Sequence, residues 1–334
     1  MATKVRGEPL HRQLLRELSD AGCFRSATWR SMCYAAFVFA GYFSAFALLL
    51  ADSGALLRAG AAIGGAFFSV QAGFLAHEAG HGALTRKRGL ATLLAHLFHT
   101  FAGGFSSSYF RHIHALHHAH CNDRGRDPDM QSGFVSMHPQ SAAAKTGIGK
   151  LISRQQAVLV WLLIGLQGFT LKLDGIAYVC RNARRTLVDQ AFLILHFALW
   201  LLAPALALNA VDALLNYALM TLFIGFYTGS IFIVNHVGTR VIEPHERLSL
   251  LRQELAVTRN LGASRVHDVY FGGVNNHIEH HLFPSMPTAR LREARRITRD
   301  FCRRHGLAYR EMTWLQAARE ATRHFKAMST WVAQ

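Results

Sequence analysis

The sequence predicts an all-α integral-membrane protein, and three features of its 334 residues lead to that prediction. Hydrophobic residues make up 51% of the chain and charged residues only 17%, which argues against a disordered chain and against a typical soluble enzyme. Several apolar runs approach the roughly 20 residues that a helix needs to cross a bilayer. Basic residues, 36 against 20 acidic ones, gather beside these runs, as juxtamembrane charges do.

Four transmembrane helices in two hairpins are expected from the longest apolar runs. They cover residues 33–50, 55–76, 190–208 and 213–234. Two shorter runs, 89–105 and 157–171, are expected to be interfacial or re-entrant segments. The second of these is followed at once by Lys172 and Asp174, which end its apolar character.

The charges orient these helices. The first 31 residues are basic, and the basic run 86–88 follows the second helix, whereas the connections 52–54 and 209–212 contain no lysine or arginine. The positive-inside rule therefore places both termini in the cytoplasm. We expect one integral-membrane domain over residues 1–334, with a cytoplasmic helical cap formed by 77–189 and 236–334. A cleaved secretory signal is not expected, because the N-terminus is polar and its first apolar run lacks a small-residue cleavage site.

The net charge of +16 indicates an anionic partner, and lipid headgroups of the bilayer fit it best. Nucleic acid is not expected, because the chain has no P-loop and no zinc-finger spacing. The basic C-terminal segment has two interpretations: it rests on anionic lipid, or it binds a phosphate-bearing or acidic acyl carrier. Its arginines are Arg290, Arg292, Arg295, Arg296, Arg299, Arg303 and Arg304. The five scattered cysteines have no CxxC pair and are interpreted as ordinary packing residues.

Three histidine clusters carry the unusual chemistry of the sequence. They consist of His77 and His81, then His114, His117 and His118, then His277, His280 and His281. Residues three or four apart lie on one face of a helix, so each cluster can aim its imidazoles at one point. Eight imidazoles exceed the ligands that one ion takes, so a histidine-ligated dinuclear metal site is predicted in the cytoplasmic cap. His236, at the end of the fourth predicted helix, is a ninth candidate, although it could instead bond near the headgroups.

Polar residues beside the clusters are candidates to orient the ligating imidazoles. Ligating histidines usually donate their second ring N–H to an acceptor. The candidates are Glu78, Asp127, Asp129, Asn235, Asn275 and Glu279. For the carboxylates, a solvated or salt-bridged surface role is equally compatible with the sequence. Seven histidines outside the repeating spacing are expected not to bind metal: His96, His99, His112, His120, His138, His196 and His267.

These motifs resemble those of the integral-membrane fatty acid desaturases, particularly the acyl-lipid and front-end branch. The resemblance rests on the three boxes in this order, on Asp127-Pro128-Asp129, and on the run GGVNNHIEHHLFP at 272–284, and it covers about residues 35–300. It implies four spanning helices and two iron ions held by the histidines. The implied reaction is the dioxygen-dependent removal of two hydrogens from a fatty acyl chain, carried by a lipid, coenzyme A or a carrier protein.

The sequence departs from the front-end pattern in three places. His277 stands where many front-end members have glutamine, which leaves the position of the new double bond open. Glu78 stands where aspartate is more usual. His138-Pro139 is the one His-Pro pair, and it does not continue into the HPGG motif of a fused haem domain. The implied electron donor is therefore a separate protein, either a ferredoxin or a b-type cytochrome with its reductase.

Two alternatives remain from the sequence. A hydroxylase, ketolase or acetylenase on the same scaffold would share the first hydrogen abstraction. A membrane metal transporter would instead place its histidines near the bilayer midplane. The predicted spanning helices contain only His196, so the transporter is the weaker alternative.

Overall fold

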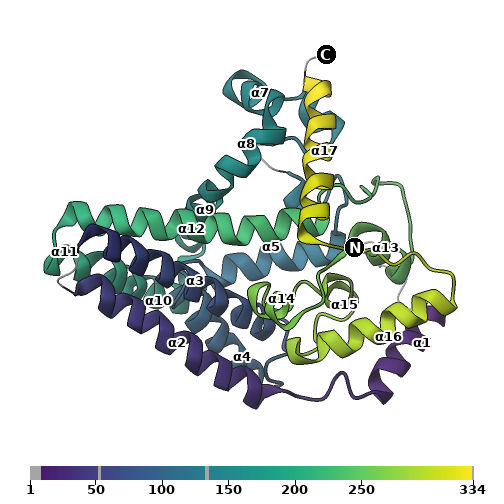
Figure 1. Ribbon diagram of the computed structural model, residues 1–334, viewed down its shortest axis with the longest axis horizontal. Coiled ribbons are helices and arrows are strands. Elements are labelled where there is room, and N and C mark those ends of the chain that lie inside the picture. The colour runs from purple at the N-terminus through teal and green to yellow at the C-terminus, as the bar shows by residue number, and fades with distance from the viewer. Residues whose placement is uncertain (1–8, 52–53, 132–134, 333–334) are drawn as a thin grey trace. The chain divides into compact units, whose positions relative to one another are not determined.

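The computed structural model describes residues 9–51, 54–131 and 135–332, so Lys4, Arg6 and most of the predicted outer connection at 52–54 lie outside the described residues. Helices make up most of what is described, as Figure 1 shows. The chain forms two compact units. Unit 1 contains residues 1–25, 113–163 and 230–334, and unit 2 contains residues 26–112 and 164–229. All five cysteines are free thiols.

Unit 2 is a bundle of mostly long, apolar helices. Its elements are α2 (Thr28–Leu50), α3 (Ala55–Gly80), α4 (Arg88–Ala95), the π-helix η1 (His96–Phe101), η3 (Ile164–Leu166), α9 (Gln167–Arg181), η4 (Ala183–Arg185), α10 (Leu187–Phe197), the π-helix η5 (Ala198–Leu202) and α11 (Ala203–Ala207), with the first parts of α5 (Ser107–His120) and α12 (Ala210–His236). Helices α2 and α3 pack lengthwise as a hairpin (Figure 1). Small residues allow this close packing: a Cβ atom on Gly41 would lie 2.1 Å from the ring of Phe68.

Five helices among the described residues are long and apolar enough to cross a membrane. They are Thr28–Leu50, Ala55–Gly80, Gln156–Arg181, Leu187–Ala207 and Ala210–His236. Four of them cover the predicted spans. The fifth, Gln156–Arg181, contains the 157–171 run that we expected to be interfacial or re-entrant. The other short run, 89–105, folds as α4 followed by η1 and is not among the five.

Lys172 does not interrupt its helix because its charge faces the interior of unit 2. The side chain is buried, and Nζ donates hydrogen bonds of 2.8 Å to the carbonyl of Gly103 and 2.8 Å to the hydroxyl of Tyr217. The same hydroxyl lies 2.9 Å from Nε2 of His196, whose Nδ1 lies 2.7 Å from the carbonyl of Phe101. Burial of an ionisable group in an apolar bundle is tolerated when such partners are present.

A second buried network in unit 2 fixes the start of α5, the helix that carries the second histidine box. Asp189 of α10 is fully buried and accepts hydrogen bonds from the hydroxyls of Ser106 at 2.9 Å and Ser108 at 2.6 Å. It also accepts the backbone N–H of Ser108 at 3.3 Å. A carboxylate at a helix N-terminus satisfies free N–H groups and complements the helix dipole.

Unit 1 is built from shorter helices. Its elements are α1 (Pro9–Asp20), the 3₁₀ turn η2 (Pro128–Met130), α6 (Pro139–Ala143), α7 (Gly147–Arg154), α8 (Gln156–Leu163), α13 (Leu250–Val257), β1 (Asn260–Leu261), α14 (Arg265–Tyr270), α15 (His277–Leu282), η6 (Thr288–Arg290), α16 (Leu291–Arg304), β2 (Glu311–Met312) and α17 (Trp314–Val332), with the second parts of α5 and α12. The two short strands pair in parallel, with Asn260 opposite Glu311.

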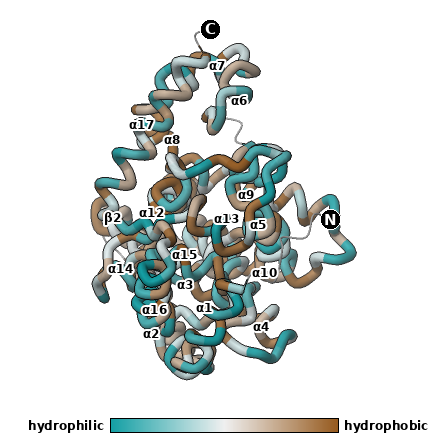
Figure 2. The backbone as a smooth tube through the Cα atoms, turned by 90° about the vertical axis from the view of Figure 1, so that its right-hand side faces the viewer, coloured by the Kyte–Doolittle hydropathy of each residue, from teal (hydrophilic) through white to brown (hydrophobic). Residues whose placement is uncertain are grey.

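Two of the hydrophobic cores among the described residues of unit 1 support its helices. In the first, Leu14 and Leu18 of α1 pack with Leu251, Ile278 and Phe301, which come from α13, α15 and α16. In the second, α17 packs against α6, α7 and α8, with Phe325 at its centre. Hydrophilic and hydrophobic residues alternate along α17 in Figure 2, as expected of a helix that buries one face. The first core places α15, the helix of the third histidine box, on a rigid support.

Candidate metal centre

The first histidine box closes helix α3 in unit 2. His77 and His81 lie one turn apart, with ring centroids separated by 4.7 Å in an edge-to-face arrangement. The helix ends here because Gly82 adopts a left-handed φ of 69°, which allows the next backbone N–H to bond back to the carbonyl of Glu78 at 3.0 Å. The side chain of Glu78 is buried and accepts a hydrogen bond of 3.1 Å from Ser31.

The second box lies on α5 and continues into a loop that fixes one of its rings. Nδ1 of His117 lies 3.1 Å from both carboxylate oxygens of Asp127 and 3.3 Å from a carboxylate oxygen of Asp129. Asp127 is itself held by the backbone N–H groups of Asn122 at 2.7 Å and Asp129 at 3.0 Å. Since carboxylates only accept, His117 carries its proton on Nδ1, and the lone pair of Nε2 is directed away from Asp127.

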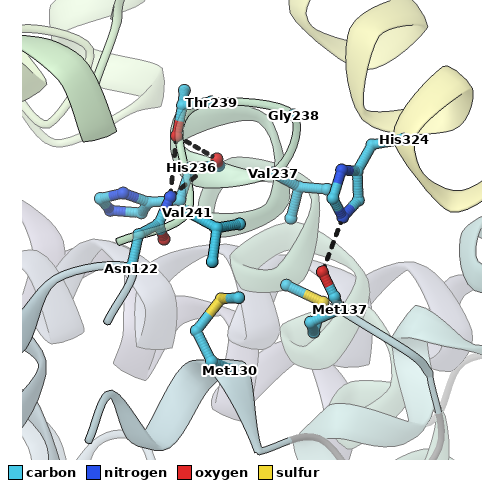
Figure 3. Close-up of a pocket in the computed structure, with 9 residues that line it drawn as sticks. All are labelled: Asn122, Met130, Met137, His236, Val237, Gly238, Thr239, Val241 and His324. Atoms are coloured by element: carbon cyan, nitrogen blue, oxygen red, sulfur yellow. Dashed lines mark hydrogen bonds between the residues drawn. The ribbon is translucent and has the colours of Figure 1, made fainter. Parts of the chain in front are cut away.

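His236, the last residue of α12, is oriented in a similar way. Its Nδ1 lies 3.1 Å from the carbonyl oxygen of Val257, so this nitrogen carries the proton and Nε2 carries the lone pair. Asn122 fixes the end of α12. Its amide donates to the hydroxyl of Thr239 at 2.8 Å and to the carbonyl of His236 at 3.4 Å (Figure 3). Asn122 has a φ of 52°, a left-handed conformation that asparagine tolerates better than most residues.

The third box forms the short helix α15, in which His277, His280 and His281 are all buried. Nε2 of His277 lies 2.6 Å from Nε2 of His236. Nε2 of His280 lies 3.1 Å from Nε2 of His118, whose ring nitrogen is also 3.0 Å from Nε2 of His114. The chain therefore brings boxes two and three and the end of α12 together within unit 1.

Two groups of side chains in unit 1 have the spacing of metal ligands. The donor atoms of His117, Cys121, His236 and His281 all lie within 4.8 Å of one another, and all four residues are buried. The donor atoms of His114, His118 and His280 also lie within 4.8 Å of one another. These separations suit ligands of one ion, because metal–nitrogen and metal–sulfur bonds are about 2.0–2.3 Å long.

The donor atoms fit a metal better than they fit one another. Nε2 of His281 and Nδ1 of His277 are buried and have no hydrogen-bond partner among the described residues. Buried polar atoms in proteins are almost always paired, so such orphans need an explanation. Nδ1 of His281 also has no hydrogen-bond partner among the described residues, although it lies 3.3 Å from a carboxylate oxygen of Glu254. Imidazole nitrogens of this kind suit iron, zinc, copper and nickel.

Burial also keeps these imidazoles in the form that binds metal. Desolvation lowers the pKa of His277 to about 3. Desolvation likewise lowers the pKa of His281 well below its usual value, and the neighbouring histidines add to the effect. Both rings are therefore neutral near pH 7, and neutral imidazole is the ligating form.

Two of the residues predicted to orient the ligands contact other groups instead. Glu279 is buried and accepts hydrogen bonds from the amide of Asn260 at 2.9 Å and the hydroxyl of Tyr309 at 2.7 Å. Its buried position raises its pKa. It thus fastens α15 to β1. Asn275 donates to Asp268 at 2.9 Å and stabilises the loop before α15. The amide of Asn235 is buried without a hydrogen-bond partner among the described residues.

Three residues of the centre were not singled out from the sequence. Asn122 and Glu254 contact the ligand histidines only because segments distant along the chain meet in the fold. Cys121, interpreted from the sequence as a packing residue, does pack in a buried hydrophobic cluster with Ile242 and Val257, and its Sγ also lies 3.5 Å from Nδ1 of His236.

A pocket adjoins His236, between α12, α17 and the loop that contains Met130 and Met137 (Figure 3). Its cavity volume is only about 10 Å³, roughly the space of one water molecule and far below the roughly 300–1,000 Å³ of typical ligand sites. His324 closes one side by donating from Nε2 to the carbonyl of Met137 at 2.9 Å. The pocket is too small to take a long acyl chain.

Comparison with known proteins identifies the family of this chain. The fatty acid desaturase family model matches residues 53–313. An acyl-lipid 8-desaturase of Rebecca salina is 27% identical over 75% of this chain and 59% of its own length. A Delta(8)-fatty-acid desaturase of Borago officinalis is 28% identical over 78% of this chain and 61% of its own length. A Delta(5) fatty acid desaturase of Caenorhabditis elegans is 28% identical over 72% of this chain and 56% of its own length. The chain thus spans about three fifths of the length of these relatives. It belongs to the fatty acid desaturase family.

Proposed function

We propose that this protein introduces a carbon–carbon double bond into a fatty acyl chain, using dioxygen and two iron ions held by its histidines. The observation that carries the proposal is the convergence of imidazole nitrogens from α5, α12 and α15: Nε2 of His277 lies 2.6 Å from Nε2 of His236, and Nε2 of His281 is buried without a hydrogen-bond partner among the described residues. The family supplies the reaction class, and its relatives are desaturases by name.

Nine histidines are proposed to hold the two ions: His77, His81, His114, His117, His118, His236, His277, His280 and His281. Within unit 1, two groups of donor atoms offer two separate positions, as a pair of ions requires. The family resemblance assigns His77 and His81 to the same set of ligands. Bound iron would supply the oxidising power that breaking an unactivated C–H bond requires.

The residues around the histidines have a positioning role in this proposal. Asp127 holds the proton of His117 at Nδ1, the carbonyl of Val257 does the same for His236, and Glu254 faces Nδ1 of His281. The contacts with Asp127 and Val257 fix the tautomers of His117 and His236 and leave Nε2 of each ring as the proposed ligating atom. Such support limits reorganisation, because the ligands are already in place before the ions bind.

The substrate and partners follow from the family and from the charge. We propose that the acyl chain is presented on a lipid, on coenzyme A or on a carrier protein, and that a separate ferredoxin or b-type cytochrome with its reductase supplies electrons. The excess of basic residues beside the apolar helices favours a cytoplasmic position for the metal centre and both termini.

The first test is the metal content of detergent-purified protein from cells grown with iron, together with Mössbauer spectroscopy. We expect close to two magnetically coupled irons per chain. A single mononuclear ion, or zinc that iron cannot replace, would contradict the proposed centre and would reopen the transporter alternative. Metal uptake by proteoliposomes tests that alternative directly.

The second test is the mass of acyl products in expressing cells supplied with dioxygen. Desaturation removes two hydrogens, hydroxylation adds one oxygen, and acetylene formation removes four hydrogens. We expect the loss of two hydrogens, and no product from His280→Ala. His245→Ala is the matched control, because His245 is exposed and lies outside the boxes. Product formation by His280→Ala at the normal level would contradict the metal assignment.

A further inference from the structure

We propose that α7 and the exposed side of α8 form an interfacial anchor, a surface that lies in the headgroup layer of the bilayer and binds anionic phospholipid. The inference goes beyond the proposed function and does not depend on it, because the anchor contains no residue of the metal centre. The interfacial anchor consists of four apolar and two basic side chains: Ile148, Leu151, Val158, Leu162, Lys150 and Arg154.

Contacts within unit 1 fix which side of these two helices faces α17. The buried amide of Gln156 donates a hydrogen bond of 3.1 Å to the carbonyl of Phe325. The carbonyl of Ser153, also buried, accepts a hydrogen bond of 2.9 Å from the hydroxyl of Ser329. Val160 packs in the core around Phe325, and α7 and α8 lie next to α17 in Figure 1. The opposite side of α7 and α8 is therefore held outward.

The outward side of these helices is apolar. Ile148 and Leu151 on α7, and Val158 and Leu162 on α8, are all exposed. Single exposed apolar side chains are ordinary on a protein surface, but a group of them usually marks an interaction site. Leu162 is 72% exposed, about as much as Ile194 at 68%, which lies on one of the helices that are long and apolar enough to cross a membrane. The interfacial anchor thus exposes its apolar side chains as a lipid-facing helix does.

The charge of the same segment is positive. Lys150 and Arg154 lie one turn apart on α7, and neither side chain forms an ion pair or a hydrogen bond with another residue that the structure describes. The sequence has no aspartate or glutamate between Asp129 and Asp174 that could balance them. By contrast, Arg292 of the arginine-rich C-terminal segment pairs with a neighbouring aspartate. An anionic headgroup would supply the counter-charge that the interfacial anchor lacks.

The combination of the two kinds of side chain identifies the partner as a membrane surface. At 100° per residue, the basic side chains of α7 lie beside its exposed apolar ones. Such a helix places its apolar side chains at the boundary of the acyl chains, while lysine and arginine reach the phosphates. The chain itself favours the same partner, because α8 begins the apolar helix Gln156–Arg181. A soluble acidic partner would have to cover a surface that continues into a membrane helix.

Fluorescence quenching of the full-length protein, in lipid nanodiscs that hold one copy each, tests the location of the interfacial anchor. A fluorophore is attached at Ile148→Cys after the exposed thiols are removed by Cys33→Ser and Cys180→Ser. We expect strong quenching by a spin-labelled lipid and weak quenching by acrylamide in the water. His245→Cys, at an exposed position of an acidic loop, is the matched control and should show the reverse. Equal quenching by acrylamide at both positions would overturn the proposal.

The composition of the disc tests the preference for anionic lipid. Discs of phosphatidylcholine alone are compared with discs of phosphatidylcholine and phosphatidylglycerol in equal parts. We expect phosphatidylglycerol to increase the quenching at position 148 by spin-labelled lipid, and Lys150→Glu with Arg154→Glu to lose this increase. Arg240→Glu with Arg247→Glu changes the net charge equally on the acidic loop and should keep it. An increase that persists without the two basic residues would overturn their assignment to the headgroups.

A second copy of the chain is the other occupant that this experiment can detect. Protection of position 148 that appears only in vesicles crowded with protein, and is absent in single-copy discs, would assign the surface to a second copy and overturn the lipid assignment. Iron content and product formation in detergent should not change in Lys150→Glu with Arg154→Glu. Failure of the interfacial anchor is therefore distinct from failure of the proposed metal centre.

Discussion

His196 in unit 2 and His281 in unit 1 are both deeply buried histidines, yet their surroundings differ in kind. Both nitrogens of His196 have partners, a carbonyl at 2.7 Å and a tyrosine hydroxyl at 2.9 Å. Neither nitrogen of His281 has a hydrogen-bond partner among the described residues, although Nδ1 lies 3.3 Å from a carboxylate oxygen of Glu254. The comparison separates a histidine whose hydrogen bonds hold the fold together from one whose nitrogens are open to the metal that we propose.

The same contrast extends to the groups around each ring. Around His196, the amine of Lys172 and the hydroxyl of Tyr217 complete a network in which donors meet acceptors. Around His281, imidazole nitrogens of His118, His236 and His277 face other nitrogens. Four substitutions test this division between the two regions, and they should separate effects on metal content from effects on stability.

The largest effect is expected for His281→Ala. Removing this ring deletes a proposed metal ligand, so iron content and product formation should both fall strongly. The fold should remain, because Nε2 makes no hydrogen bond with the described residues that the substitution would break. Metal analysis and acyl-product mass in the same preparation check this. Two irons per chain in a well-folded His281→Ala protein would remove the basis for the comparison.

Asp127→Asn should have the next largest effect. The amide of asparagine keeps the shape of the carboxylate but accepts a weaker hydrogen bond from Nδ1 of His117. Its NH2 group would also face the backbone N–H groups that donate to the carboxylate in the unmodified protein. Loss of such support typically costs about 10–100-fold in metal affinity or activity. Metal titration with a competing chelator measures it. Glu243→Gln, on a partly exposed surface ion pair, is the control.

Lys172→Met tests the partnered side of the comparison. The change removes the amine from the carbonyl of Gly103 and the hydroxyl of Tyr217, and an unsatisfied buried polar group costs about 1–3 kcal/mol. We expect a lower Tm in detergent with iron content unchanged. Loss of iron at normal stability would show that the network serves the metal centre after all.

Arg292→Gln should have the smallest effect. Arg292 pairs with Asp268 at the surface, where both side chains are partly exposed, and exposed ion pairs contribute no more than about 1 kcal/mol. Neither Tm nor iron content should change measurably. A changed Michaelis constant for one acyl donor only would instead favour the carrier-binding interpretation of the arginine-rich segment.

Local patterns predicted the helices and histidine boxes of this chain better than they predicted contacts between distant segments. The spacing within each box follows directly from helix geometry, so the boxes could be read from the sequence. The partners of Glu279 could not, because Asn260 and Tyr309 meet it only through the pairing of β1 with β2. The continuation of the 157–171 run as one helix to Arg181 was not predicted, because Lys172 interrupts the apolar run in the sequence but finds buried partners in the fold.

The 3.1 Å between His118 and His280 also restricts how the chain threads the bilayer. Because these residues lie side by side, we expect the chain between them to return to the side of the membrane from which it started. Three of the apolar helices lie in that interval, and an odd number of complete crossings would leave the two boxes on opposite faces. We therefore expect an even number of complete crossings, two of the three helices. We expect the helix Gln156–Arg181, which carries Lys172 and Asp174, to enter the membrane and return to the same side without crossing it.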